Sequence, residues 1–196
     1  MPRTREFTPE RVLDAALDLF WSKGYKDCSM ADVVKQSGVA RYGLYQAFKD
    51  KDQLYYATLK RYHQRLHDLF VKPYCGQSGD HSLNEHFDLV LDQLSKGDRG
   101  GCFAHQAAIE RGSQDENVKD IVGSIFEDAR NAYRILIENG IKDGSIRNLP
   151  INDLVTYVMG IQRALITMTK QSCSEQERRE YVRCALALLQ PSRILN

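Results

Sequence analysis

Residues 29–48 of the chain, SMADVVKQSGVARYGLYQAF, decide the fold of its N-terminal part. Ser29 and Asp32 have the spacing of a capping box, which predicts the start of a short helix. Gly38 follows that helix at a point where a sharp turn favours a residue that tolerates a positive φ. A second short helix is predicted from about Arg41 to Ala47. Two short helices joined by a tight turn are typical of a helix-turn-helix unit.

The two short helices have an apolar side and a polar side. The apolar residues, which we expect to pack together and against a preceding helix, are Val33, Val39, Leu44 and Phe48. The residues that we expect to remain outward are Arg41, Tyr42, Gly43 and Gln46. Such a helix fits the major groove of B-DNA, about 12 Å wide, where each base pair displays a distinct pattern of donors and acceptors. The unit therefore predicts binding to double-stranded DNA.

Helical periodicity continues along the rest of the chain, and strand-like alternation is absent. A first helix is predicted from Pro9, with Thr8 as its N-cap and Gly24 at its end. A long helix is predicted from Lys51 to Pro73, with Asp50 in its capping box. Further helices are predicted over about 82–95, 102–111, 116–140, 151–171 and 175–189. The predicted fold class is all-α, with about nine helices: an N-terminal three-helix head that contains the helix-turn-helix, and a helical body.

The composition is typical of a globular protein. The chain has 196 residues, of which 42% are hydrophobic and 27% charged, and this balance excludes a disordered chain. No apolar run reaches the roughly 18 residues that a membrane-spanning helix needs. The five cysteines contain no CxxC pair and no secretory signal is present, so we expect reduced thiols and a cytoplasmic protein without a membrane partner.

The net charge of +1, taken alone, argues against a nucleic-acid partner. The charge is unevenly distributed, however. Residues 1–65 contain 12 Lys and Arg against 8 Asp and Glu, whereas residues 66–196 contain 15 against 18. A basic head attached to a slightly acidic body is compatible with DNA binding by the helix-turn-helix unit. The near-neutral total therefore does not exclude DNA.

The N-terminal part of the chain resembles the tetracycline-repressor (TetR) family of bacterial transcriptional regulators. The resembling residues span about the first 60 positions and agree in order and spacing: Val12, Leu13, Asp14, Ala15, Ala16, Phe20, Lys23, Gly24, Tyr25, Ser29, Met30, Ala31, Asp32, Val33, Ser37, Gly38, Val39, Gly43, Leu44, Tyr45, Phe48, Lys49, Asp50, Lys51 and Leu54. The remaining two-thirds is similar to the family in its helical pattern and length. The resemblance implies a DNA-binding helix-turn-helix domain over residues 1–52 and a ligand-binding and dimerisation domain over residues 53–196.

The resemblance implies that several polar groups contact DNA phosphates. Tyr45 and Lys51 would each bind a phosphate, and Ser29 would add a further contact that fixes the register on the duplex. Lys51 stands at the start of a predicted helix, whose free amides and dipole also favour an anion. The expected DNA-binding residues are Ser29, Arg41, Tyr42, Gly43, Tyr45, Gln46, Lys49 and Lys51.

Base reading would fall to Arg41, Tyr42 and Gln46, since arginine can pair with guanine and glutamine with adenine. Three positions depart from the family's pattern. Ala40 stands where a Ser or Thr cap is usual, and Tyr42 is bulky where a small residue is common. Gly43 replaces a frequent Ser or Thr. These departures affect which groups meet the bases.

The resemblance also implies that the last two helices pair two subunits, so that a homodimer reads a palindromic operator. The expected interface residues recur at helical spacing and are Leu154, Val158, Ile161, Leu165, Met168, Val182, Leu186 and Leu189. A helix that is apolar on more than one side needs a second surface to pack against. The alternative is that these residues face only the core of their own subunit.

The resemblance further implies that helices of the body form a pocket for an unknown small-molecule inducer, which releases the repressor from its operator. The candidate ligand-binding residues are Phe70, Phe87, Leu91, Cys102, Phe103, Gln106, Ile109, Glu110, Ile125 and Tyr133. Gln106 and Glu110 lie one helical turn apart and would give a pocket its orienting polar groups. The alternative for the apolar members of this set is ordinary core packing.

Cys102 allows a second interpretation. It follows Gly100 and Gly101 at a predicted helix start, where free amides and the helix dipole lower the pKa of a thiol, and His105 shares its face. By resemblance to family members with a Gly-Cys at a similar place, such a thiol would sense electrophiles or oxidants, whereas the alternative is a small buried cysteine that fills space. A thiol enzyme is less favoured, because no third orienting residue and no P-loop, GxGxxG, HExxH or GxSxG signature is present. We expect no catalytic residue and no cofactor.

One pair of histidines has a spacing that suits a metal ion. His63 and His67 are four residues apart on one helix, but two ligands do not make a site. The other candidate ligands, His81, His86 and Cys75, lie in or just beyond a predicted loop. We therefore expect no metal centre.

Overall fold

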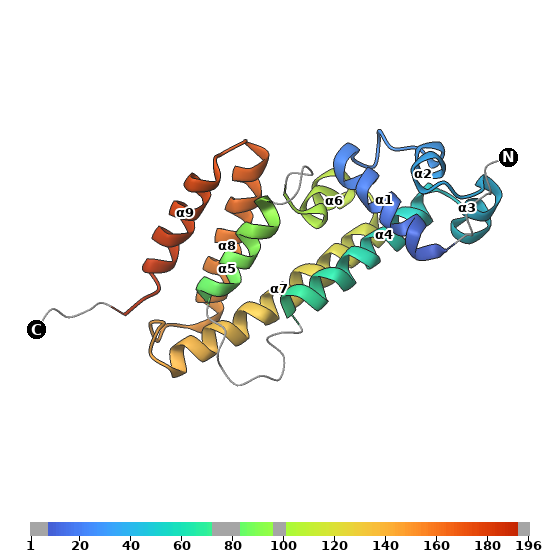
Figure 1. Cartoon of the computed structure of the whole chain (residues 1–196). Coiled ribbons are helices and arrows are strands. Elements are labelled where there is room, and N and C mark those ends of the chain that lie inside the picture. The colour runs from blue at the N-terminus through green and yellow to red at the C-terminus, as the bar shows by residue number, and fades with distance from the viewer. Residues whose placement is uncertain (1–7, 72–82, 96–100, 192–196) are drawn as a thin grey trace, which may run out of the picture. The chain divides into compact units, whose positions relative to one another are not determined.

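The computed structural model describes residues 8–71, 83–95 and 101–191, and these residues form helices without strands (Figure 1). The helices are α1 (Pro9–Lys23), α2 (Met30–Ser37), α3 (Arg41–Phe48), α4 (Lys51–Leu66), α5 (Leu83–Ser95), α6 (Phe103–Arg111), α7 (Glu116–Lys142), α8 (Ile151–Lys170) and α9 (Glu175–Ala187). A π-helical segment, η1 (His67–Val71), continues α4. The predicted all-α fold is confirmed for this part of the chain. None of its helices has the length and apolar character needed to cross a membrane.

The helices divide into two compact units. The first unit comprises the described residues up to Leu66 together with Cys102–Ile125, and therefore contains α1 to α4, α6 and the start of α7. The second unit contains α5, the remainder of α7, α8 and α9. The first unit thus extends beyond the expected DNA-binding domain of residues 1–52, because α6 packs against α4.

The helix-turn-helix in the first unit forms as predicted. Ser29 accepts a hydrogen bond from the Asp32 amide, and the Asp32 carboxylate accepts one from the Ser29 amide, which completes the capping box of α2. Gly38 ends α2 with φ +68°, in the left-handed region that glycine tolerates. The apolar residues predicted to pack here are buried, apart from the half-buried Phe48; the buried ones are Val33, Val39 and Leu44.

The ends of the neighbouring helices differ in how well they are capped. Thr8 precedes α1 as predicted, but its side chain makes no capping hydrogen bond. Ala40 precedes α3 and has no side chain that could accept one. Asp50 Oδ1 accepts a hydrogen bond from the Gln53 amide (2.8 Å) and thereby caps α4. The first turn of α3 therefore lacks the side-chain support that α2 and α4 receive.

Within the first unit, an aromatic cluster packs α6 against α1 and α4. The Phe103 ring is fully buried, and its centroid lies 5.7 Å from those of both Tyr55 and Tyr62 in α4. Trp21 of α1 packs on Tyr62 with a centroid distance of 5.1 Å, close to edge-on. These offset and edge-on contacts are the favourable geometries for aromatic pairs. The N-terminal head and α6 consequently share one core.

The second unit has a separate apolar core formed by α5, α7, α8 and α9. Arg179 of α9 also connects to α5, through ion pairs with Asp92 (3.0 Å) and Asp88 (3.6 Å). Seven of the eight residues expected at the dimer interface lie in this core: Leu154, Val158, Ile161, Leu165, Val182, Leu186 and Leu189. The eighth, Met168, packs against the core.

The single chain already packs these side chains into its own core. Each of the seven is at most 6% exposed in the single chain, so it has almost no surface left to offer a partner. The alternative interpretation of the sequence, packing within their own subunit, describes them. The outward faces of the same helices carry different residues: Thr156, Tyr157, Gly160, Arg163 and Thr167 in α8, Glu180, Cys184 and Ala187 in α9, and Leu188 directly after α9.

Candidate DNA-binding surface

The outward face of α3 presents four of the expected DNA-binding side chains. Leu44 is fully buried and fixes the inner side of the helix. Arg41, Tyr42, Tyr45 and Gln46 are exposed on the helix, with Tyr42 at 77%. The Arg41 guanidinium lies 5.4 Å from the centre of the Tyr45 ring, a cation–π contact across one helical turn. This face offers hydrogen-bond donors, an amide and two aromatic rings.

The remaining candidates flank this helix. Ser29 is exposed, but its hydroxyl is used within the capping box and donates to Asp32 Oδ2 (2.6 Å). Gly43 is half-buried, and Lys49 is exposed at the end of α3 with φ +58°. All eight expected DNA-binding residues lie in the first unit.

Lys51, the first residue of α4, is held by the turn that follows α1. Its ammonium lies 4.2 Å from the centre of the Tyr25 ring and donates a hydrogen bond to the Lys26 carbonyl (3.4 Å). An ammonium has three donors, so this arrangement leaves Lys51 able to bind a phosphate. The side chain expected to bind a phosphate thus stands at a helix N-terminus and is held by two contacts.

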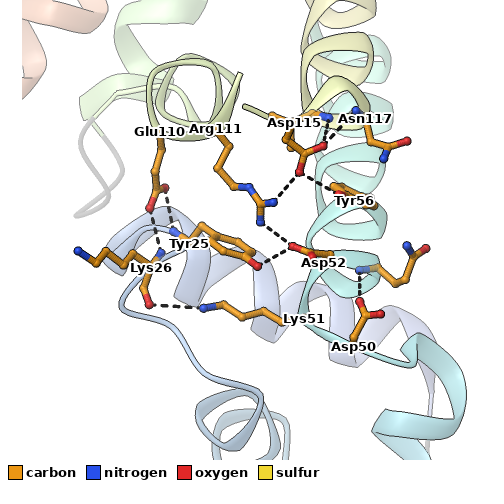
Figure 2. A network of polar contacts seen from close by, with 12 residues as sticks. Tyr25, Lys26, Asp50, Lys51, Asp52, Tyr56, Glu110, Arg111, Asp115 and Asn117 are labelled. Carbon is orange, nitrogen blue, oxygen red and sulfur yellow. Dashed lines mark hydrogen bonds and ion pairs between the residues drawn. The ribbon is translucent and has the colours of Figure 1, made fainter. Parts of the chain in front are cut away.

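The Tyr25 ring belongs to a polar network that the sequence did not indicate (Figure 2). Its hydroxyl donates to Asp52 Oδ1 (2.5 Å), and Arg111 donates to the same oxygen (2.6 Å). Arg111 also donates to Asp115 Oδ2 (2.6 Å), which accepts a further hydrogen bond from the Tyr56 hydroxyl (2.8 Å). The network therefore connects the turn after α1, the first turns of α4 and the end of α6.

Burial and the Asp52 carboxylate raise the pKa of Tyr25 to about 12, and the hydrogen bond from Tyr25 lowers the pKa of Asp52. At neutral pH Tyr25 is therefore a donor and Asp52 an anion, which matches the observed hydrogen bonds. Asp115 had a local signal in the sequence, because its Oδ1 caps α7 by accepting from the Asn117 amide (3.0 Å). Arg111 stands four positions before Asp115, a spacing that suits an ion pair, but no local signal connects it to Asp52, which is 59 positions away.

The candidate ligand-binding residues fall into two groups, one in each unit. Those of the first unit are Cys102, Phe103, Gln106, Ile109, Glu110 and Ile125. The Gln106 amide donates to the Phe20 carbonyl (3.4 Å), and the Glu110 carboxylate accepts from the Tyr25 and Lys26 amides. Ile109 is 86% exposed. The contacts of Ile109 and Glu110 therefore do not support the pocket roles expected for them.

The second group belongs to the second unit: Phe87, Leu91 and Tyr133 lie in its core, and the half-buried Phe70 packs against that core. This core also contains His86, whose Nε2 lies 3.2 Å from the Tyr133 hydroxyl. Burial lowers the pKa of His86 to about 4, so its ring is neutral at physiological pH. The sequence placed His86 only among candidate metal ligands and missed its place beside Tyr133.

Cys102 does not have the environment of an activated thiol. The Tyr62 hydroxyl donates to its sulfur (3.3 Å), and burial raises the pKa of the thiol. The expectation that the helix start lowers this pKa was therefore wrong in direction, because desolvation outweighs the backbone amides.

The described residues contain no group of three or more His, Cys, Asp or Glu that could hold a metal ion. Two of the histidine and cysteine candidates, His81 and Cys75, lie outside the described residues. His86 lies in the aromatic core beside Tyr133.

Family models match both parts of the chain. The model of bacterial regulatory proteins of the tetR family matches residues 12–58, and the model of the tetracyclin repressor-like C-terminal domain matches residues 81–185. The HTH-type transcriptional repressor ComR of Escherichia coli is 33% identical over 106 residues, which cover 52% of this chain and 50% of ComR. The HTH-type transcriptional regulator YezE of Bacillus subtilis is 34% identical over 62 residues, 32% of each chain. The chain thus spans half or less of the length of these relatives.

Solved structures share the fold over most of this chain. A TetR-family regulator from Agrobacterium tumefaciens has a TM-score of 0.79 at 16% identity, covering 93% of this chain and 97% of that one. A cysteine mutant of the TetR-family regulator CifR, complexed with a 26-bp operator DNA, has a TM-score of 0.77 at 22% identity, covering 95% and 99%. Because one family model spans more than half of the chain and the other covers the helix-turn-helix, the chain belongs to the tetR family of bacterial regulatory proteins.

Proposed function

We propose that the protein is a homodimeric, ligand-responsive transcriptional repressor that binds a palindromic operator through α3. The observation that carries this proposal is the exposed face of α3, where Arg41, Tyr45 and Gln46 stand on a helix anchored by the buried Leu44. Two comparisons support it: ComR is named a transcriptional repressor, and CifR was solved on operator DNA.

The side chains of this face would divide between positioning and reading. Tyr45, Lys49 and Lys51 would bind phosphates and fix the register, whereas Arg41 and Gln46 would meet base edges in the major groove. The contact between Arg41 and the Tyr45 ring limits the directions that the guanidinium can take. A guanidinium restricted before binding loses less conformational entropy when it reaches a guanine.

The dimer would form through the outward faces of α8 and α9. Gly160 and Thr156 give α8 a surface of small side chains, and a Cβ at Gly160 would meet no atom within 4 Å in the single chain. Tyr157 and Leu188 add exposed apolar area, at 38% and 64% exposure. Small and apolar side chains that point outward on two adjacent helices suit close packing against a second copy.

The ligand response would belong to the second unit. His86 and Tyr133 form a polar pair within an otherwise aromatic and aliphatic core, which is the composition of a small-molecule site. An inducer would act by preferring a conformation in which the two recognition helices no longer match successive major grooves.

The proposal is tested by selecting a duplex from a random DNA library with the purified protein and measuring its affinity at several salt concentrations. Lys51→Ala should weaken binding to selected and scrambled duplexes alike and reduce the salt slope by about 1 for each bound subunit. Arg41→Ala should weaken the selected duplex more, by about 1–3 kcal/mol for each arginine–guanine pair that it removes, and relax the sequence preference at that position. A wild-type protein that selects no duplex would contradict the proposed function.

A further inference from the structure

Glu110, near the end of α6, binds the turn that follows α1. Its carboxylate accepts hydrogen bonds from the Tyr25 amide (2.8 Å) and the Lys26 amide (2.9 Å), one on each oxygen. Gly24 makes this approach possible: its φ is +83°, and a Cβ there would lie 3.2 Å from Glu110 Oε1. A side chain 84 positions away in the sequence from Lys26 thus fixes two consecutive amides of this turn.

The same turn holds Lys51 on its other side. The Lys26 carbonyl accepts the hydrogen bond of the Lys51 ammonium, and the Tyr25 ring provides the cation–π contact. Glu110 therefore acts on the amides of the two residues whose carbonyl and ring hold the lysine.

Arg111 approaches the Tyr25 ring as well. Its guanidinium lies 3.8 Å from the ring centre, and Figure 2 shows Arg111 and Lys51 on opposite sides of the ring. The guanidinium also bonds Asp52, the residue after Lys51, and Asp115 at the start of α7. One arginine thus fixes both the ring on which Lys51 packs and the first turn of α4.

We propose that Glu110 and Arg111 are positioning residues for DNA binding, which act through Tyr25 and Lys26 on the Lys51 ammonium. The inference rests on the proposed function, because it takes Lys51 as a phosphate contact. A lysine held in place before binding loses less conformational freedom when it meets the phosphate. Removing Glu110 leaves two amides without their acceptor and lets the turn, and with it the lysine, move.

The test uses the loss of charge in Glu110→Gln, because electrostatics and positioning predict opposite changes in DNA affinity. Glu110→Gln removes a negative charge, and long-range electrostatics alone would therefore strengthen binding to DNA. We expect the opposite: roughly tenfold weaker binding to the selected duplex and a salt slope close to that of Lys51→Ala. Glu116→Gln is the matched control, because Glu116 is exposed in the same unit, pairs with Lys119 on its own helix, and loses the same charge. It should leave binding unchanged or slightly stronger.

A double-mutant cycle separates positioning from general destabilisation. Glu110→Gln should cost less than about threefold in a Lys51→Ala background, because the lysine that it positions is already absent. Arg111→Lys keeps the positive charge, but a single ammonium cannot replace the guanidinium that donates to both Asp52 and Asp115. Its effect on DNA binding should likewise be smaller in the Lys51→Ala background. This second variant decides the question if Glu110→Gln proves to be unfolded in a thermal melt.

The outcomes distinguish the inference from the function on which it rests. If the wild-type protein selects no duplex, the proposed function fails and the inference fails with it. If the wild-type protein binds but the Glu110 and Lys51 effects multiply, or Glu110→Gln strengthens binding, only the inference is overturned.

Discussion

At the scale of single residues, His86 makes the stability of the protein depend on pH. Its ring is buried in the second unit against Phe70, Phe87 and Tyr133. The pKa is about 4 in the folded chain, against an ordinary value near 6.5 in the unfolded chain. Between these values the unfolded chain binds more protons, so the free energy of unfolding falls as the pH falls.

We predict that this single group removes roughly 3 kcal/mol of stability between about pH 6.5 and pH 4. Denaturant unfolding of the wild type and of His86→Gln across this range measures the difference, and carboxylates that titrate in both proteins cancel. The glutamine keeps a polar partner for the Tyr133 hydroxyl. The variant should lose less stability than the wild type on acidification. Parallel pH profiles for the two proteins would show that the pKa of His86 is the same in the folded and the unfolded chain, and would contradict the prediction.

The sequence predicted individual residues well where the signal was local. Ser29 and Gly38 could be placed because a cap and a left-handed turn are determined by a few neighbouring residues. Glu110 and Arg111 could not, because their partners Tyr25 and Asp52 come from other elements and a carboxylate or guanidinium on a helix is ordinarily a solvated group. The helical spacing of Gln106 and Glu110 suggested that Glu110 lines a ligand pocket, whereas its carboxylate binds the backbone amides of the turn after α1.

At the scale of elements, α3 is the helix of the helix-turn-helix whose N-terminus has no side-chain cap. Ala40 has the extended backbone of an N-cap residue but offers no acceptor to the first amides of the helix. We predict that Ala40→Ser raises the free energy of unfolding by about 1 kcal/mol, measured by denaturant unfolding without DNA. Ala47→Ser is the control, because Ala47 is exposed inside the same helix, where serine lowers stability by a few tenths of a kcal/mol. Equal effects of the two serines would argue against a capping role.

The end of α4 shows where a helical pattern is insufficient to predict the element. The sequence predicted one α-helix from Lys51 to Pro73, but the chain changes to a π-helical segment at His67. The wider turn of that segment gives its side chains other directions than an α-helix would. Leu69 is 37% exposed, whereas Val71 is buried. A prediction from periodicity assumes a constant number of residues per turn, so it cannot detect the change from α-helix to π-helix.

At the scale of the whole molecule, the predicted dimer depends on faces that periodicity could not separate. Small or apolar residues at helical spacing suit both a core face and the proposed interface face of α8 and α9, so the prediction from the sequence assigned the face with the larger side chains to the partner subunit. The structure places that face, including Val158 and Leu165, in the subunit's own core.

We predict that Leu188→Glu weakens dimerisation at least tenfold, because the dimer would bury a charge that the monomer leaves in water. Leu188 is 64% exposed in the single chain, so the substitution should cost the subunit little stability. Ile109→Glu is the matched control: Ile109 is also an exposed apolar residue, but it lies on α6 in the first unit. Sedimentation equilibrium measures both. Unchanged association of Leu188→Glu would place the interface elsewhere.

The inclusion of α6 in the first unit has a consequence for hybrid regulators. A hybrid joined at residue 52 or 58 would give the recognition head of this chain a foreign sensor. Either junction removes the Glu110 carboxylate that binds the Tyr25 and Lys26 amides, and it breaks up the aromatic cluster of Tyr55, Tyr62 and Phe103. A functional hybrid should therefore keep two separate segments of this chain, residues 8–66 and residues 102–125. The sequence of the foreign sensor would be inserted between these segments and after the second one.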